Sequence, residues 1–98
     1  MSAAHNTKEW HAFRRIQRAR WQKLIDASGV ACRRCRVLIR KDQRWQLGHI
    51  IDVRLGGALT DPGNVWPEHP RCNAQGGARL SHAIRYAKRT RDEREPGW

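Results

Sequence analysis

The chain has 98 residues, 39% of them hydrophobic, and its 20 Lys and Arg outnumber its 9 Asp and Glu to give a formal net charge of +11. A chain this short forms one domain with a modest core, so a bound metal or similar stabilising element is expected. The charge favours nucleic acid as the partner over an anionic membrane surface or a merely soluble basic surface. No long apolar run follows Met1, which predicts neither a signal peptide nor a membrane helix, and hence a cytoplasmic protein.

Residues 7–28 are expected to form a basic N-terminal helix. Asn6 or Thr7 can cap its start, with Glu9 completing a capping box, and Gly29 can end it. Three- and four-residue spacing defines a mostly apolar stripe of Trp10, Phe13, Gln17, Trp21, Leu24 and Ile25. The opposite side is basic and carries Arg14, Arg15, Arg18 and Lys23. This side is either solvated or in contact with phosphates, and the charge of the whole chain favours phosphate contact.

The middle of the chain favours short strands. Residues 37–39 and 45–51 are rich in strand-forming residues, and the polar turn between them predicts a hairpin. A loop over 52–64 follows, and a helix is expected over 71–90, where Gly76 and Gly77 are typical of a kink or a break. These elements predict an α+β protein with a single domain over 1–98. We assign its core to 30–80 and a basic C-terminal helix and tail to 79–98, the tail beginning at residue 91.

The three cysteines suggest a metal site. Cys32 and Cys35 form a Cys-x-x-Cys pair, and in a reducing compartment an odd number of cysteines favours metal over disulfide. His69 and Cys72 repeat the same two-residue gap, and three thiolates with one imidazole are a recognised ligand set for structural zinc. The alternative is three unrelated thiols and a surface histidine. We expect zinc, which would make His69 unavailable as a catalytic base.

Three further polar residues, His49, Asn64 and Asn73, follow the first cysteine pair in a suggestive order. The succession of Cys-x-x-Cys, "GHI", "GG" and "NVWPEHPRCN" resembles the zinc-containing HNH endonuclease family, and small bacteriophage members in particular. The resemblance covers roughly residues 30 to 80. It implies a ββα-metal fold with a zinc knuckle, in which His49 ends the first strand, Asn64 lies in or beside the second, and Asn73 starts the helix.

The resemblance also implies metal-dependent hydrolysis of DNA phosphodiester bonds. His49 would take the proton from the attacking water, Asn64 would brace the loop and orient the His49 ring, and Asn73 would bind a catalytic Mg²⁺ or Mn²⁺. From the residue types alone, His49 fits the role of a base or of an ion ligand equally well. Each residue also has a structural interpretation, with His49 as a strand-end residue, Asn64 in a turn and Asn73 as a helix cap.

One position departs from the family pattern. Many members carry an acid, which binds the ion, directly before the catalytic His, whereas this chain has Gly48. Asp52 is the nearest replacement, although an ordinary aspartate at the start of a loop explains it equally well. A hard cation prefers charged oxygen ligands, so the ion site expected from His49, Asn73 and Asp52 depends on that aspartate.

The expected partner is double-stranded DNA, bound mainly through its phosphates. Arg54 and Arg71 lie close in sequence to the site and are expected to hold the scissile strand. Further contacts are expected from Arg14, Arg15, Arg18, Arg33 and Arg34. The resemblance implies a nuclease or nickase that assists terminase during phage DNA packaging in the bacterial cytoplasm, or one with a homing or restriction role. The competing function is a non-catalytic zinc-stabilised module that binds DNA or protein through a degenerate HNH site.

Overall fold

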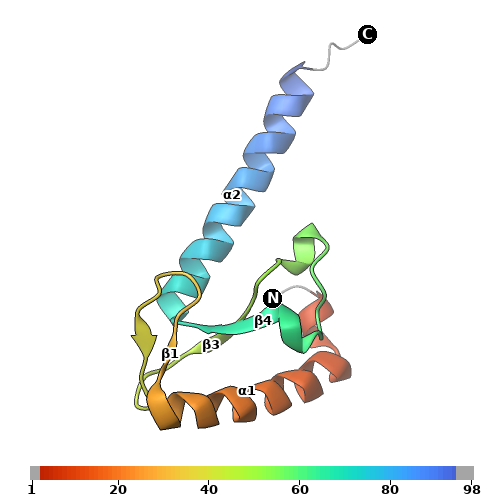
Figure 1. The fold of residues 1–98 in the computed structure, drawn as a ribbon. Helices are drawn as coiled ribbons and strands as arrows, with labels where there is room; N and C mark the ends of the chain where they lie inside the picture. The colour runs from red at the N-terminus through yellow and green to blue at the C-terminus, as the bar shows by residue number, and fades with distance from the viewer. Residues whose placement is uncertain (1–2, 95–98) are drawn as a thin grey trace.

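Two long helices and two small antiparallel sheets make up the protein, which is therefore α+β as predicted. The computed structural model describes the backbone of residues 3–94 and the side chains of residues 5–89. In chain order the elements are η1 (Ala3–Asn6), α1 (Lys8–Ser28), β1 (Val30–Ala31), β2 (Leu38–Ile39), β3 (Gln46–His49), η2 (Val53–Leu55), η3 (Pro62–Asn64), β4 (Val65–Glu68) and α2 (Pro70–Arg94). Figure 1 shows α1 packed along one side of the strands, with α2 projecting away from them on the other.

Helix α1 occupies the segment that the sequence predicts. Thr7 is its cap, because the Thr7 side chain accepts a hydrogen bond from Trp10 N at 3.2 Å. The capping box with Glu9 is wrong, since the residue three positions after this cap is Trp10. Gly29 ends the helix with φ of +74°, a conformation that favours glycine, and its N–H donates to Ile25 O at 2.8 Å.

The apolar stripe of α1 packs against the strands. Four residues of the stripe are buried, Trp10, Gln17, Trp21 and Ile25, whereas Leu24 of the same stripe is 45% exposed. The core consists of Trp10, Trp21, Ile25, Cys32, Ile39, Trp45, Leu47 and Val65. Burying a large apolar side chain stabilises the fold by about 1.5 to 3 kcal/mol. This core is therefore small for a domain whose net charge of +11 also causes repulsion between its positive side chains.

The strand pairing differs from the predicted hairpin. β2 pairs with β1, with Val30 opposite Ile39, so the ribbon closes around the Cys32–Cys35 turn and not around residues 40–44. β3 pairs instead with β4, with His49 opposite Val65. The local pattern of the sequence did not predict β4 because Pro67 interrupts it, and only the resemblance implied a second strand at or beside Asn64. Proline is tolerated here since both strands of a two-stranded sheet are edges.

The loop between β3 and β4 explains the Gly56-Gly57 pair. Gly56 has φ of +90° and its N–H donates to Val53 O at 3.1 Å, which ends η2. A Cβ on Gly57 would overlap the backbone carbonyl of Ile51. The loop therefore folds back on itself closely enough that one glycine is needed for its φ angle and the other for its lack of a side chain.

Helix α2 follows β4 after one residue and runs without a break from Pro70 to Arg94. The break expected at Gly76 and Gly77 is wrong, and so is the tail over residues 91–94; residues 95–98 lie outside the described residues. The proposed boundary near residue 80 falls inside this helix. Neither α1 nor α2, nor any shorter helix in residues 3–94, has an apolar stretch long enough to cross a membrane.

Candidate functional site

Four side chains form a group that could hold a metal ion such as zinc. They are Cys32, Cys35, His69 and Cys72, and their ligand atoms all lie within 4.8 Å of one another. The distance from His69 Nδ1 is 3.3 Å to Cys35 Sγ and 3.9 Å to Cys72 Sγ. A tetrahedron with Zn–S bonds of about 2.3 Å and Zn–N bonds of about 2.0 Å has ligand–ligand distances of about 3.5 to 3.8 Å. The predicted grouping is therefore present, with spacings close to those that zinc requires.

Backbone N–H groups are directed at the sulfur of Cys32. Burial raises the pKa of the Cys32 thiol, but hydrogen bonds from the amides of Cys35, His69 and Arg34 outweigh it and lower the pKa to about 6. At Cys72, burial and the neighbouring sulfurs of Cys35 and Cys32 raise the pKa to about 11. Thiolates packed this closely repel one another, and a cation at their centre removes that repulsion.

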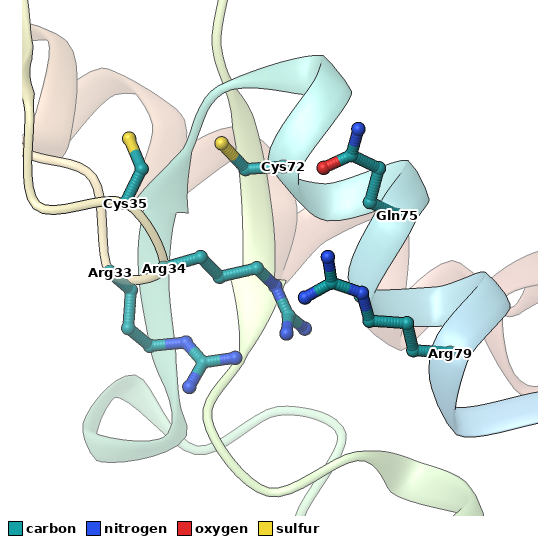
Figure 2. Close-up of a pocket in the computed structure, with 7 residues that line it drawn as sticks. Arg33, Arg34, Cys35, Cys72, Gln75 and Arg79 are labelled. Carbon is teal, nitrogen blue, oxygen red and sulfur yellow. The ribbon is translucent and has the colours of Figure 1, made fainter. Parts of the chain in front are cut away.

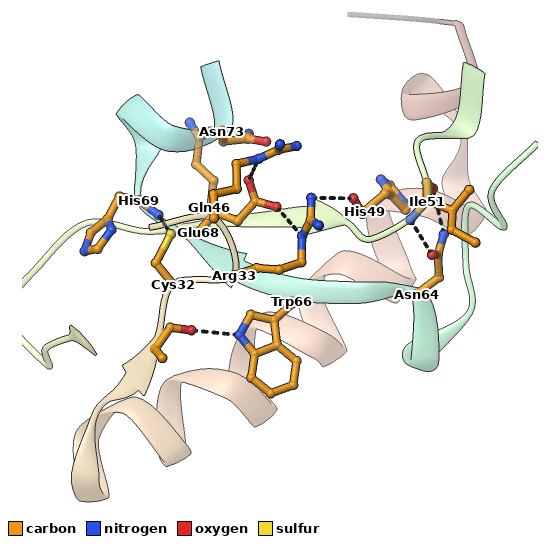
Figure 3. A network of polar contacts seen from close by, with 12 residues as sticks. Cys32, Arg33, Gln46, His49, Ile51, Asn64, Trp66, Glu68, His69 and Asn73 are labelled. Carbon is orange, nitrogen blue, oxygen red and sulfur yellow. Dashed lines mark hydrogen bonds and ion pairs between the residues drawn. The ribbon is translucent and has the colours of Figure 1, made fainter. Parts of the chain in front are cut away.

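The four-residue group joins parts of the chain that are distant in sequence. Cys32 and Cys35 lie on the turn between β1 and β2, whereas His69 precedes α2 and Cys72 lies in its first turn. The backbone N–H of His69 donates to Cys32 Sγ at 3.5 Å, which connects the two parts directly (Figure 3). The start of α2, and with it the next residue, Asn73, is thereby held against β3 and β4.

His49 lies at the end of β3, as predicted. Its Nε2 is 2.9 Å from the carbonyl oxygen of Leu59, in the loop. Its ring packs against Trp10 of α1 and His5 of η1, with ring centroids 5.2 and 5.4 Å away. Burial, followed by the neighbouring charge of His49, lowers the pKa of His5 below its ordinary value of 6.5. No local pattern in the sequence points to His5, because His5 contacts His49 only through the tertiary fold.

Asn64 braces the loop that carries Leu59, whose carbonyl oxygen contacts His49. Its side chain is buried, and its Oδ1 accepts from Ile51 N at 2.8 Å. Its Nδ2 donates to Ile51 O at 3.0 Å and to Ala58 O at 2.8 Å. Figure 3 shows Asn64 reaching from the start of β4 toward Ile51, next to His49. His49 and Asn64 are thus brought together at one end of the β3–β4 pair.

Asn73 lies at the other end of the same strand pair. Its Nδ2 donates to Gln46 Oε1 at 2.6 Å, which turns the carbonyl oxygen of its amide away from Gln46. Gln46 begins β3 and His49 ends it, and a strand rises about 3.4 Å per residue, so the two positions lie about 10 Å apart. The predicted convergence of Asn73 on His49 is therefore not a direct contact.

Asp52 acts as a cap of η2. Its Oδ1 accepts from Arg54 N at 2.8 Å and from Arg54 Nε at 3.1 Å, and its Oδ2 accepts from Arg54 Nη2 at 3.3 Å. The hydrogen bond from the Arg54 side chain lowers the pKa of the Asp52 carboxyl, and the nearby charge of His49 contributes to the same effect. Both oxygens of the predicted ion ligand are therefore engaged by Arg54.

A buried acid that no local sequence pattern predicted lies at the Asn73 end of the strand pair, where it is opposite Gln46. Glu68 is fully buried at the end of β4, and its carboxylate accepts from Arg33 Nε at 3.2 Å and Arg34 Nε at 2.6 Å. Arg33 Nη2 also donates to His49 O at 3.4 Å, so the ion pairs extend along β3. The only sequence signal for Glu68 was an acid inside the "PEHPRCN" string, beside a predicted metal ligand.

Basic side chains from two elements line one hollow beside the metal group. Its volume is about 450 Å³, and its walls are Arg33, Arg34, Cys35, Cys72, Gln75, Gly76 and Arg79. Figure 2 shows the guanidinium groups of Arg34 and Arg79 directed toward the same space. Arg79 and Gln75 were not predicted, because only the packing of α2 beside the Cys32–Cys35 turn brings them there. Like charges this close create a favourable place for an anion.

The other predicted DNA contacts fall into two groups. Arg14, Arg15 and Arg71 are exposed. Arg18 instead packs over the Trp45 ring at 4.2 Å and donates to Trp45 O at 3.1 Å, and Arg54 donates to Gly77 O on α2. Arg18 and Arg54 therefore have structural contacts in addition to any contact with phosphate. Trp66 has a structural role as well, since its Nε1 donates to Ala31 O at 2.8 Å and its ring lies 4.6 Å from that of Trp21.

The site thus combines a cysteine and histidine group that could hold zinc, a histidine bonded to a braced loop, and a buried acid with basic neighbours. Comparison of the chain with protein-family models, with curated proteins and with solved structures finds no match in any of the three.

Proposed function

We propose that the protein is a metal-dependent DNA endonuclease or nickase of the HNH type, with zinc as a structural ion at Cys32, Cys35, His69 and Cys72. The observation that carries this proposal is the setting of His49. The ring lies at the end of β3, its Nε2 is bonded to a loop carbonyl, and buried Asn64 fixes that loop. The antiparallel pair β3–β4 leads directly into α2, the order of elements that the resemblance implies.

The hydrogen bond of His49 determines which of its nitrogens can act as the base. A carbonyl oxygen only accepts hydrogen bonds, so the contact with Leu59 O places the proton of the neutral ring on Nε2. Nδ1 then carries the lone pair that can accept a proton from an attacking water. The carbonyl of Leu59 also stabilises the imidazolium that forms, and Asn64 keeps this carbonyl in position by fixing Ile51 and Ala58.

The remaining parts of the reaction require a positive environment for the scissile phosphate. A divalent ion, Mg²⁺ or Mn²⁺, would supply Lewis acidity toward the phosphate and the leaving oxygen. Arg33, Arg34 and Arg79 line one cavity, and guanidinium groups bind phosphates in a bidentate manner. The exposed Arg14, Arg15 and Arg71 add contacts that depend on charge and not on base sequence. Action beside a phage terminase in the host cytoplasm is part of this proposal.

A plasmid-nicking assay tests the proposal. Zinc-loaded protein with Mg²⁺ or Mn²⁺ is compared with His49→Ala and with the matched control His82→Ala, an exposed histidine on α2. Removing a general base typically costs about 10² to 10⁴ in rate, so His49→Ala should lose most nicking while His82→Ala keeps it. Equal absence of cleavage by all three folded, zinc-containing proteins would contradict the nuclease proposal.

One observation favours the second candidate, a non-catalytic DNA- or protein-binding module. The carboxylate of Glu68 is paired with two arginines, and Asp52 is paired with Arg54. Both acids near the site are therefore neutralised by side chains of the protein itself. If the protein is such a non-catalytic module, Mg²⁺ should change its affinity for DNA only as much as another salt of equal ionic strength does. His49→Ala should then bind DNA as the native chain does.

A further inference from the structure

Each oxygen of the buried Glu68 carboxylate holds one arginine by its Nε. Arg33 Nε lies 3.2 Å from Oε2, and Arg34 Nε lies 2.6 Å from Oε1. A guanidinium group has five N–H donors, so a contact through Nε leaves the Nη donors for other acceptors. Arg33 uses Nη2 for His49 O, whereas neither Nη of Arg34 has an acceptor in the part of the chain that the structure describes. Glu68 therefore fixes the Arg34 guanidinium and leaves its outer edge unoccupied.

Gly76 of α2 makes room for the Arg34 guanidinium. A Cβ at position 76 would overlap Cζ, Nη1 and Nε of Arg34, whereas a Cβ on the next residue, Gly77, would meet nothing within 4 Å. Glycine destabilises the middle of a helix relative to alanine, and at position 76 it allows the planar guanidinium to lie against the helix backbone. The Arg34 guanidinium is thus held between Glu68 of β4 and the surface of α2.

Arg79, on the next turn of α2, completes the hollow. Its guanidinium is directed into the same space as that of Arg34, and the amide of Gln75 lies beside them (Figure 2). Within residues 5–89 the Arg79 side chain meets neither a hydrogen-bond acceptor nor an acid, and none of the described residues that line the hollow is acidic. Two guanidinium groups in this arrangement repel each other, and an anion between them removes the repulsion.

The hollow stays positive when the nearest charges are counted. Its three arginines outweigh the single negative charge of Glu68. A zinc ion with three thiolates and a neutral imidazole beside the hollow would add one more negative charge, which still leaves a positive surplus. Arginine binds phosphate oxygens in a bidentate manner, so phosphate is the anion that this lining fits best. The exposed Arg71 and Arg85 extend the positive charge along α2, which favours a chain of phosphates over a single free one.

We propose that Glu68 and Gly76 build a phosphate subsite for a nucleic-acid backbone by holding the Arg34 guanidinium opposite that of Arg79. Arg34 and Arg79 bind the phosphate. Glu68 and Gly76 are positioning residues, because they act through the Arg34 guanidinium. This inference rests on the proposed nuclease function, and it identifies the residues that hold the DNA substrate in place.

The first test moves the Arg34 guanidinium without changing any charge. Gly76→Ala places a methyl group where that guanidinium lies, and Gly77→Ala is the matched control with open space. Binding of a short DNA duplex to the zinc-loaded chain is measured by fluorescence anisotropy without Mg²⁺ or Mn²⁺, so that no DNA is cut. Because hydrogen bonds to charged groups are strong, Gly76→Ala should bind at least about tenfold more weakly, while Gly77→Ala binds as the native chain does. Equal affinities of the two folded variants would overturn the proposal.

The second test uses the sign of a charge effect. Glu68→Gln keeps the shape of the side chain but raises the net charge by one, so a surface that attracts DNA by charge alone would bind it more tightly. If Glu68 positions Arg34, this variant should instead bind about tenfold more weakly. Asp26→Asn, which removes an exposed acid of α1, should bind no more weakly than the native chain. Unchanged or tighter binding by folded Glu68→Gln would overturn the role of Glu68. If this variant does not fold, the two glycine variants decide.

A third measurement separates a subsite for a nucleic-acid backbone from a site for free phosphate. Inorganic phosphate and the duplex are added separately to the native chain, and the Nε–H signals of Arg34 and Arg79 are followed by NMR. Both signals should shift at duplex concentrations far below the required concentration of inorganic phosphate, because other arginines contact further phosphates. Shifts at equal concentrations would identify a site for free phosphate, and shifts confined to Arg14 and Arg15 would place the DNA elsewhere. Either result would overturn the proposal.

Failure of the subsite is distinguishable from failure of the nuclease function. If the native chain binds DNA through the hollow but cuts none, the subsite stands and the nuclease proposal fails. If the native chain and Gly76→Ala bind and nick DNA equally well, the nuclease proposal stands and the subsite fails.

Discussion

The two ends of the β3–β4 pair are held in different ways. At the metal end, four side chains from two short sequence pairs meet in one group. At the His49 end, the ring contacts η1, α1 and the loop, and the loop is fixed by Asn64 at the start of β4. One end depends on a few strong ligands, whereas the other depends on many weaker contacts from distant segments. Loss of a single residue should therefore affect the first end far more than the second.

The largest expected effect is the loss of the metal group. Cys35→Ser removes one of four ligands, so stoichiometric zinc and cooperative unfolding should both disappear. Structural zinc contributes about 10 to 16 kcal/mol of apparent binding in small zinc peptides, which exceeds the stability of most small domains. Zinc content by mass spectrometry and near-ultraviolet circular dichroism measure the outcome.

The matched control for this prediction is Val37→Ser, because Val37 is 62% exposed on the same turn. It should keep both zinc and fold. A Cys35→Ser protein that is folded and free of metal would show that the cysteine and histidine group is not the stabilising element at this end.

At the His49 end, Asn64→Ala should have an intermediate effect. The substitution leaves Ile51 N, Ile51 O and Ala58 O without the side chain that bonds them. At about 1 kcal/mol for each hydrogen bond, the unfolding free energy should fall by about 3 kcal/mol. Urea denaturation of the zinc-loaded protein measures this loss.

Zinc content should stay the same in Asn64→Ala, because the metal group lies at the other end of the strands. Asn73→Ala, which loses one bond to Gln46, is the matched asparagine and should lose about 1 kcal/mol. Equal losses in the two variants would mean that the loop is not held mainly by Asn64.

The same difference explains what could be predicted from the sequence. The four metal ligands repeat a two-residue gap, and helix α1 repeats its apolar residues every three or four positions, so local patterns were sufficient for both. The local pattern missed strand β4, for which only the resemblance implied a strand at or beside Asn64, because Pro67 breaks the pattern of a strand. The pairing of β4 with β3 is a property of the tertiary fold. The predicted hairpin was wrong because residues 38–39 pair with residues that precede the Cys32–Cys35 turn.

Glu68 illustrates the limit of local patterns most clearly. Its burial depends on Gly48 across the sheet and on two arginines in the Cys32–Cys35 turn. None of these residues is near Glu68 in sequence, so the sequence indicated the absence of an acid at position 48 without indicating where another acid lies. Arg79 was missed for the same reason, since it reaches the basic hollow only through the position of α2.

Two adjacent glycines of α2 provide a smaller and sharper comparison. Gly77 has open space where a Cβ would be, so Gly77→Ala should stabilise the helix by about 0.5 to 1 kcal/mol. A Cβ on Gly76 would overlap the guanidinium group of Arg34. Gly76→Ala should therefore displace Arg34 from Glu68. The loss of this ion pair should cancel the stabilisation that alanine would otherwise bring to the helix.

Thermal unfolding of the two glycine variants measures this difference. In an Arg34→Met background the obstacle is removed, so Gly76→Ala should then stabilise the protein about as much as Gly77→Ala does. Equal stabilisation by both substitutions in the native background would show that the Arg34 guanidinium group can move away from a Cβ at position 76. The ion pair between Arg34 and Glu68 would then persist without a cost in stability.

The smallest expected effect concerns the contact between His5 and His49. Burial and the charge of His49 lower the pKa of His5 below 6.5, whereas Asp52 raises it. The folded chain therefore binds fewer protons at His5 than the unfolded chain does. The contribution of His5 to stability is fully present above pH 6.5 and is lost as the pH falls through the lowered pKa.

NMR titration of the His5 ring measures this pKa directly. In His49→Gln the repulsion is absent, so the midpoint should move back toward 6.5, while Asp52→Asn should move it further down. A midpoint at or above 6.5 that does not respond to residue 49 would mean that η1 does not lie against the His49 ring in solution. The His49 end would then be held by the loop and α1 alone, and fewer separate segments would stabilise it than the structure indicates.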